Sequence, residues 1–141
     1  MQKAGPIIVI EDDSDDQFIL VSIFKKLNYP NEIIFFSDGH QALEHITNTD
    51  VQPFLILSDI NMPKISGLEL RKKVRDNEKL NVKCIPYLFF TTSADSRSVL
   101  EAYSMSVQGF FQKSSKMSDL ENTLRKIVEY WQECYAPSSF V

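Results

Sequence analysis

Asp59 is the residue of this sequence whose position most suggests chemistry, because it follows a run of apolar residues directly. Residues 54–57 predict a buried strand that ends at Asp59, and Asn61 and Pro63 then predict a turn. In an open α/β sheet, ligands bind beyond the carboxyl ends of the strands. Aspartate is also a common residue for ending a strand and starting a turn. The local sequence supports both interpretations about equally.

Three other expected strands also end in polar side chains. These are Glu11, Asp12 and Asp13 after residues 7–10, Thr91 after residues 85–90, and Lys113 after residues 107–112. Residues that are scattered along the chain would meet if these strands ran parallel, because the carboxyl ends would then share one edge of the sheet. Such a convergence favours a functional carboxylate at position 59 over a simple turn residue.

Carboxylates that gather at one edge repel one another unless a cation lies among them. Mg²⁺ suits such a place, because it binds one or two carboxylates, keeps several waters and leaves room for a phosphate oxygen. A carboxylate can also accept a phosphoryl group and form an acyl phosphate. Positioning by a metal ion, a lysine and a hydroxyl would then supply most of the catalysis. Asp59, the acidic pair, Lys113 and Thr91 offer those groups.

The elements that would position these residues alternate along the chain. The expected strands are 7–10, 33–36, 54–57, 85–90 and 107–112, and five helices are expected at about 14–27, from 38 onward, 67–75, 95–103 and 117–131. Five strands alternating with five helices predict a parallel sheet covered on both faces, an α/β fold. The near-continuous apolar character of three strands agrees, since parallel strands are buried on both sides.

Two helix starts carry capping signals. Ser14 with Gln17 predicts a capping box, and Asp38 with Gln41 predicts a second helix start. The polar stretch 76–83 predicts a connection without regular structure.

Composition and charge exclude several classes of protein. A net charge of −4 argues against direct nucleic-acid binding, which usually needs a basic surface. No apolar run is long enough for membrane insertion, and the N-terminus lacks a signal peptide pattern. Cys84 and Cys134 form neither a CxxC pair nor a disulfide framework. We therefore expect a cytoplasmic protein with reduced thiols and one domain over residues 1–141, with its core at about 7–131.

Taken together, these motifs resemble the receiver domain of two-component response regulators, over about residues 7–131. The resemblance rests on Ile10-Glu11-Asp12-Asp13, on Asp59-Ile60-Asn61-Met62-Pro63 with Gly67, on Thr91-Thr92-Ser93 and on Lys113. It implies a flavodoxin-like, doubly wound sheet with strand order 2-1-3-4-5 and five helices. It also implies a stand-alone, chemotaxis-regulator-like switch without an output domain, and no enzymatic activity beyond self-phosphorylation and autodephosphorylation.

The resemblance assigns roles to individual residues. Asp59 would accept the phosphoryl group from a phosphohistidine of a sensor histidine kinase or a histidine phosphotransfer protein. Mg²⁺ would be bound by the side chains of Asp12 and Asp59, by the backbone carbonyl of Asn61 and, through water, by Glu11. Thr91, which the spacing favours over Thr92, would be the switch hydroxyl with Lys113 as its cationic partner. Phe110 would be the switch aromatic residue. A downstream partner would bind the face made by the fourth helix, the fifth strand and the fifth helix.

Two positions depart from the family pattern. The family usually has a proline in a cis peptide after the lysine, whereas Ser114 stands here. A cis bond before a residue other than proline costs about 2.5–4 kcal/mol, so either the site carries that strain or the loop is built differently. Phe110 has no hydroxyl group, so packing alone would govern its rotamer.

Two other functions compete with this interpretation. Ser114 and Phe110 would suit a pseudo-receiver, an adaptor that binds partners without phosphorylation. An aspartate-nucleophile phosphatase also places an aspartate at a strand end, but it needs a second acid two residues later, where this chain has Asn61.

Overall fold

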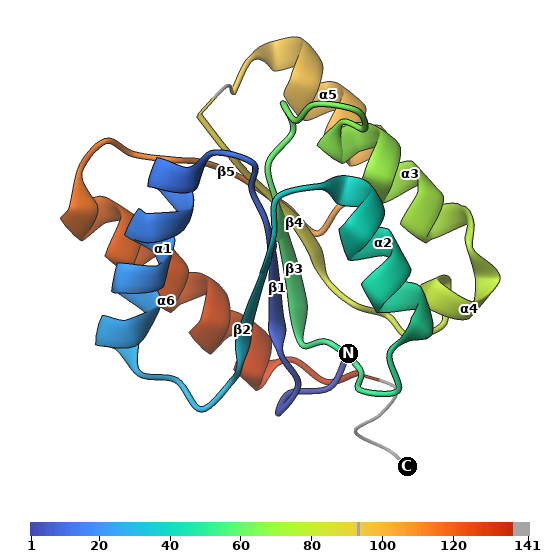
Figure 1. Cartoon of the computed structure of the whole chain (residues 1–141), viewed down its shortest axis with the longest axis horizontal. Helices are drawn as coiled ribbons and strands as arrows, with labels where there is room; N and C mark the ends of the chain where they lie inside the picture. Colours follow the sequence, from blue (N-terminus) through green and yellow to red (C-terminus); the bar gives the residue numbers. More distant parts are fainter. Residues whose placement is uncertain (93, 137–141) are drawn as a thin grey trace.

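The structure, a computed structural model, describes residues 1–92 and 94–136 and shows a parallel sheet between two helical layers (Figure 1). The strands are β1 (Ile7–Ile10), β2 (Ile33–Phe36), β3 (Leu55–Ser58), β4 (Tyr87–Thr91) and β5 (Gly109–Gln112). The helices are α1 (Ser14–Leu27), α2 (Gly39–Asn48), α3 (Gly67–Asp76), α4 (Glu78–Asn81), α5 (Ser96–Ser104) and α6 (Met117–Glu133). The predicted α/β class is confirmed.

The five strands are all parallel and lie in the order β2-β1-β3-β4-β5. The predicted flavodoxin-like, doubly wound arrangement is therefore also confirmed. The register pairs Ile10 with Ser58, and Thr91 with Gln112. These pairs stand at the carboxyl ends of their strands, so the residues that follow them share one edge of the sheet.

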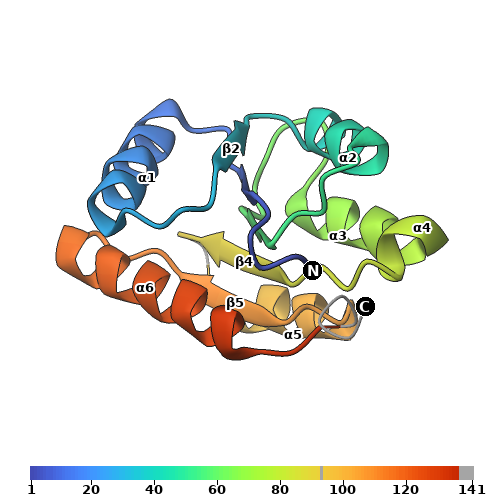
Figure 2. The same cartoon turned by 90° about the horizontal axis from the view of Figure 1, so that it is seen from below.

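Each face of the sheet has its own hydrophobic core. Helices α1 and α6 cover one face, and α2, α3, α4 and α5 cover the other, as two perpendicular views show (Figures 1 and 2). Val9 and Leu57 point into the core beneath α1 and α6, while Ile8 and Ile56 point into the other. This alternation follows from the pleat of a strand, which sends successive side chains to opposite faces.

The prediction of five helices was wrong, because the connection at residues 76–83 contains the short helix α4. Asn77 caps this helix, since its side chain accepts a hydrogen bond from the backbone N–H of Leu80. Of the four residues of α4, Leu80 alone is buried. One apolar residue gives no helical period in the sequence, which is why the stretch appeared irregular.

The start of α1 also differs from the prediction, because Asp13 rather than Ser14 is its capping residue. The Asp13 carboxylate accepts hydrogen bonds from the backbone N–H groups of Asp15 and Asp16, at 2.8 and 3.1 Å. Ser14 is already the first helical residue. Gln17 instead donates its side-chain amide to the backbone carbonyl of Glu11. These contacts fix the direction in which the chain leaves β1.

The two strands on the β4–β5 side begin two residues later than predicted. β4 starts at Tyr87 and extends to Thr91, and β5 starts at Gly109. Ile85, Pro86 and Val107 are buried all the same. Burial made these residues look like strand residues, although the strand pairing starts beyond them.

None of the helices in the described part of the chain combines the length and apolar character that a membrane crossing requires.

Candidate functional site

The carboxyl ends of β1 and β3 place Glu11 and Asp59 next to each other. The backbone N–H of Asp59 donates to the carbonyl of Ile10 at 3.0 Å, and that of Glu11 donates to the carbonyl of Phe36 at 2.9 Å. Each bond continues the sheet pairing by one residue. The two acids therefore leave the sheet from fixed positions on neighbouring strands.

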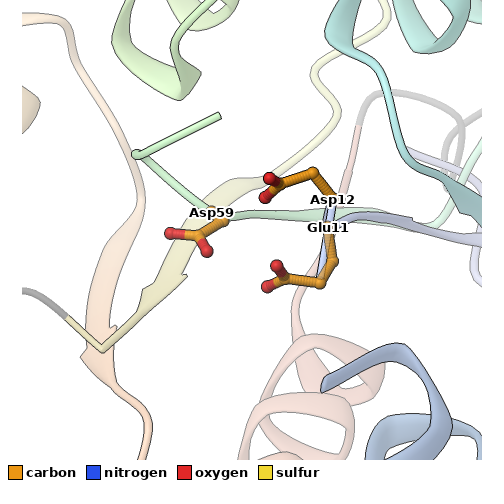
Figure 3. A group of neighbouring side chains, drawn as sticks. All are labelled: Glu11, Asp12 and Asp59. Atoms are coloured by element: carbon orange, nitrogen blue, oxygen red, sulfur yellow. The ribbon is translucent and has the colours of Figure 1, made fainter. Parts of the chain in front are cut away.

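Three carboxylates gather at this edge. Glu11, Asp12 and Asp59 each offer an oxygen, and these oxygens lie within 4.8 Å of one another. Figure 3 shows Glu11 and Asp12 on the same loop with both carboxylates turned toward Asp59. Glu11 and Asp59 are buried, at 2% and 8% exposure, while Asp12 is exposed. The cluster is thus open to solvent on one side.

Lys113 provides the positive charge beside the cluster. Its ammonium group forms ion pairs with Glu11, with Asp16 at 3.2 Å and with Asp59 at 3.6 Å, and its side chain is only 6% exposed. The described residues contain no cis peptide bond, so the bond from Lys113 to Ser114 is trans. The loop after Lys113 is therefore built without a strained cis bond, the second of the two possibilities that Ser114 left open. In this trans arrangement Lys113 still contacts the acids.

The pKa values of Glu11 and Lys113 are both shifted by burial and by the charges around them. Burial raises the pKa of Glu11 to about 7, and Asp59 adds to this rise, while Lys113 opposes it. Burial works against the charged form of Lys113, but the hydrogen bond to Glu11 and the charges of Asp59 and Asp16 raise its pKa overall. The contact with Lys113 therefore does not fully offset the effect of burial on the Glu11 carboxylate.

Thr91 and Phe110 lie where β4 and β5 approach the site. Thr91 is completely buried at the end of β4, and its carbonyl accepts a hydrogen bond from the backbone N–H of Lys113 at 2.8 Å. Thr92 is exposed. Phe110 is half-buried against the core on the α3 and α5 side, with its ring centroid 6.0 Å from that of Phe89. Ser93, the last residue of this predicted motif, lies outside the described residues.

The loop after Asp59 carries Asn61 to an exposed position and returns at Gly67. The N–H of Gly67 donates to the carbonyl of Ile60 at 2.8 Å. A Cβ atom at position 67 would lie only 2.0 Å from the carbonyl oxygen of Asp59, so the close approach requires glycine. This contact fixes the start of α3 against the backbone of Asp59.

Sequence reasoning missed two contributions to the site. Asp16 pairs with Lys113, whereas an acid in the first turn of a helix commonly interacts only with the helix dipole. Ser58 is buried and donates its hydroxyl to the carbonyl of Asp59 at 2.8 Å. The partner of Asp16, Lys113, is 97 positions away in the sequence, so no local pattern predicts this contact.

The donor set at this edge fits a hard divalent cation. Three carboxylates against one lysine leave negative charge, and oxygen ligands with an open side are what Mg²⁺ accepts in proteins. A bound cation would favour the ionised form of Glu11 and would relieve the repulsion between Asp12 and Asp59. The same open side would admit a phosphate oxygen.

Comparison with known proteins gives one family. The model of the response regulator receiver domain family matches residues 7–125 of this chain. Among curated proteins, the probable methanogenesis regulatory protein FilR2 of Methanothrix harundinacea is 28% identical over 129 residues, which cover 89% of this chain and 82% of FilR2. Response regulator Rcp1 of Synechocystis is 29% identical over 132 residues, covering 90% of this chain and 88% of Rcp1.

A solved structure agrees with both the sequence match and the fold. The Mn²⁺-bound form of response regulator Rcp1 superposes with a TM-score of 0.79 at 27% identity, covering 92% of this chain and 96% of Rcp1. The family match over residues 7–125 includes all five strands and the loops that carry the acidic cluster.

Proposed function

The chain belongs to the response regulator receiver domain family, and from this premise we propose that Asp59 is its phosphoryl acceptor. A phosphohistidine of a sensor histidine kinase or a histidine phosphotransfer protein would be the donor. The phosphorus–nitrogen bond of the donor breaks and a carboxylate oxygen of Asp59 forms the new bond to phosphorus. The donor imidazole, protonated on its other ring nitrogen, keeps the electron pair of the broken bond and leaves as neutral histidine. The phosphorylated chain then acts on a separate partner protein.

The proposal rests on one observation: Asp59 lies close to two other acids, Glu11 and Asp12, and to the buried Lys113. Of the three acids, Asp59 is the one that follows β3, the strand that lies between β1 and β4. Asp12 and Asp59 are proposed to bind Mg²⁺ through side chains, Glu11 through water, and Asn61 through its backbone carbonyl. Rcp1 has been crystallised with Mn²⁺, which supports a divalent cation in this family. Held by these residues, Mg²⁺ would supply neutralisation of the charge that develops on the transferred group.

Lys113 and Thr91 are proposed to stabilise the phosphorylated state. Lys113 is already within 3.6 Å of a carboxylate oxygen of Asp59. The Thr91 side chain starts from the end of β4, next to Lys113 in the pairing of the two strands. A phosphoryl group offers oxygens to both an ammonium and a hydroxyl group, so both residues gain an interaction after transfer.

The proposed output surface is made of α5, β5 and α6, which correspond to the family's fourth helix, fifth strand and fifth helix. Leu100 and Tyr103 of α5 are 73% and 55% exposed, and Met117 at the start of α6 is 49% exposed. Phe110 of β5 is half-buried against the core on the α3 and α5 side of the sheet. Exposed apolar residues on one surface are a usual mark of a partner site.

Beryllofluoride, a phosphoryl mimic, tests the proposal directly. We expect the purified chain to bind beryllofluoride with Mg²⁺, detected by the fluorescence of Trp131, and to gain one phosphoryl group from acetyl phosphate, detected by intact mass. Asp59→Asn should abolish both signals. Asp13→Asn is the matched control, because it removes a neighbouring charge outside the acidic cluster. A phosphoryl adduct that persists in Asp59→Asn would contradict the proposed acceptor.

The same variant distinguishes the adaptor alternative. A pseudo-receiver should bind its partner equally well as the wild type and as the Asp59→Asn variant, whereas a phosphoacceptor should bind its partner differently after modification. The trans peptide before Ser114 leaves Lys113 in contact with the acids, which supports the phosphoacceptor over the adaptor.

A further inference from the structure

Helix α5 is held to the rest of the molecule by few apolar contacts. Ala102 is its single buried residue, and Leu100 and Tyr103 point largely to solvent. The helix also has no basic residue in its last turn to interact with its final carbonyl groups. Its position must therefore depend on contacts supplied by other elements.

Arg71 of α3 supplies those contacts. Its Nε donates to the carbonyl of Met105 at 3.0 Å and its Nη2 donates to the carbonyl of Ser106 at 2.8 Å. These are the carbonyls at the C-terminal end of α5, where Ser106 has a left-handed φ of 60°. A positive charge at this end also interacts favourably with the helix dipole. Arg71 thus takes the place of a basic residue that α5 lacks.

The environment of Arg71 fixes it in this one arrangement. The residue is 7% exposed, and the structure records no ion pair for it within the described part of the chain. Its guanidinium carbon lies 5.4 Å from the centre of the Tyr87 ring. A buried charge needs hydrogen bonds or an aromatic face, and Arg71 has both kinds of contact with α5 and β4.

Tyr87 and Gly67 continue the contacts toward Asp59. Tyr87 is fully buried, and its hydroxyl lies 3.4 Å from the carbonyl oxygen of Gly67, a long hydrogen bond. Gly67 in turn packs directly on the backbone of Asp59, as the 2.0 Å distance from a Cβ atom at that position indicates. Gly67 and Arg71 are about one turn apart on α3, so a single turn of helix connects the two contacts.

We propose that Arg71 is a positioning residue that, with Tyr87, couples the Asp59–Gly67 loop to the C-terminal end of α5. The inference rests on the proposed function for its role in signalling, since it gives a route from the phosphoryl acceptor to the output surface. The physical coupling itself exists in the unphosphorylated protein. α3 and α5 lie on the same face of the sheet (Figure 1). The hydrogen bonds that Arg71 donates join them there.

Hydrogen exchange in the Mg²⁺-free protein tests the coupling without any phosphoryl chemistry. In Arg71→Met, the amides of Met105 and Ser106 should exchange about tenfold faster, because two charged hydrogen bonds to the end of α5 are lost. Exchange should also become faster at the amide of Gly67, at the other end of the coupled segment. Arg71→Lys keeps the charge and one donor and should restore part of the protection.

The matched control is Arg75→Met. Arg75 is on the same helix one turn later, its side chain is 34% exposed, and it pairs with Asp76 rather than with α5. This variant removes the same charge from α3 and should leave exchange at Met105, Ser106 and Gly67 within about twofold of the wild type. Equal exchange in Arg71→Met and Arg75→Met would overturn the proposal.

Beryllofluoride with Mg²⁺ then tests the route to α5. The wild type should change its exchange at Met105 and Ser106 when the mimic binds. Arg71→Met and Tyr87→Phe should bind the mimic within about threefold of the wild-type affinity but lose most of that change. A full wild-type response at α5 in both variants would refute the coupling. Failure of the wild type to bind the mimic would refute the proposed function instead, while the metal-free comparison would still decide the coupling.

Discussion

Lys113 carries the positive charge on which the acidic cluster depends when no cation is bound. Its side chain and that of Glu11 are 6% and 2% exposed, so solvent screens their interaction little. Asp59 and Asp16 contact the same ammonium group. A residue expected mainly to stabilise a phosphoryl group thus also stabilises the folded apo state.

Lys113→Met should reveal this second role. Methionine keeps the apolar part of the side chain but leaves the buried acids without their partner, which should lower the free energy of unfolding by about 3 kcal/mol in EDTA. Saturating Mg²⁺ should reduce this loss, because the cation takes over the neutralisation of Glu11 and Asp59. Urea unfolding in both buffers measures the effect.

Lys26→Met is a suitable control for the loss of a lysine, since Lys26 makes an exposed ion pair with Glu121. Exposed pairs contribute about 0–1 kcal/mol. If Lys113→Met were as stable as Lys26→Met in EDTA, the cluster would not need the lysine for its charge balance.

At the scale of the element, α1 shows that a helix start can decide how a site is built. Asp13 has an extended backbone conformation and caps α1, so the helix begins directly after it at Ser14. Glu11 and Asp12 precede this cap, and Asp16, in the first turn of the helix, forms an ion pair with Lys113. The cap and the cluster are parts of one local structure.

Asp13→Ala should therefore destabilise the protein by about 1 kcal/mol, the usual contribution of a helix cap. Asp13→Asn keeps an accepting oxygen and should cost much less, which separates the loss of the cap from the loss of charge. Thermal unfolding of the two variants measures the difference.

Ser14→Ala tests the alternative cap that the sequence suggested. Since Ser14 lies within the helix and is exposed, the change should stay within about 0.5 kcal/mol of the wild type. A loss at Ser14 as large as that at Asp13 would mean that the serine caps the helix in solution.

The strands and the polar residues at their ends could be predicted from sequence, because both follow local rules. Residues 7–10 are a continuous apolar run between Pro6 and Glu11, and residues 33–36 are one between Glu32 and Ser37. The predicted bounds of both match β1 and β2. The convergence of Asp59 with the other acids then follows from the geometry of parallel strands. The family pattern added the assignment of each residue.

The contacts of Arg71 could not be predicted in the same way. Its partners are 34 and 35 residues away in sequence, and a basic residue on a helix is normally expected to face solvent. The capping role of Asp13 and the helix α4 depend on which residue adopts an extended or helical backbone, and neighbouring polar residues offered several equivalent choices. Local patterns do not distinguish such cases.

At the scale of the whole molecule, the proposed metal site would make Mg²⁺ a stabilising ligand of the fold. Strands β1 and β3 both contribute to the cluster, so the cation would join two central strands. Any ligand that binds only the folded state raises the free energy of unfolding in proportion to the logarithm of its concentration.

At a Mg²⁺ concentration about 100-fold above the dissociation constant, the expected gain is about 2.7 kcal/mol, or roughly 5–10 °C in Tm. Scanning calorimetry with a Mg²⁺ series measures it, and EDTA should reverse it. Asp12→Asn should lose most of the gain, whereas Asp15→Asn, outside the cluster, should retain it. A Tm independent of Mg²⁺ would exclude the proposed metal site.

The two separate cores have a consequence for how such a chain can change. The sheet divides the apolar contacts of α1 and α6 from those of α2, α3, α4 and α5. Most substitutions in one layer therefore leave the packing of the other undisturbed, and each layer can accumulate its own replacements over generations. A lineage could therefore change the residues that pack α5 against the sheet while the core beneath α1 and α6 stayed the same.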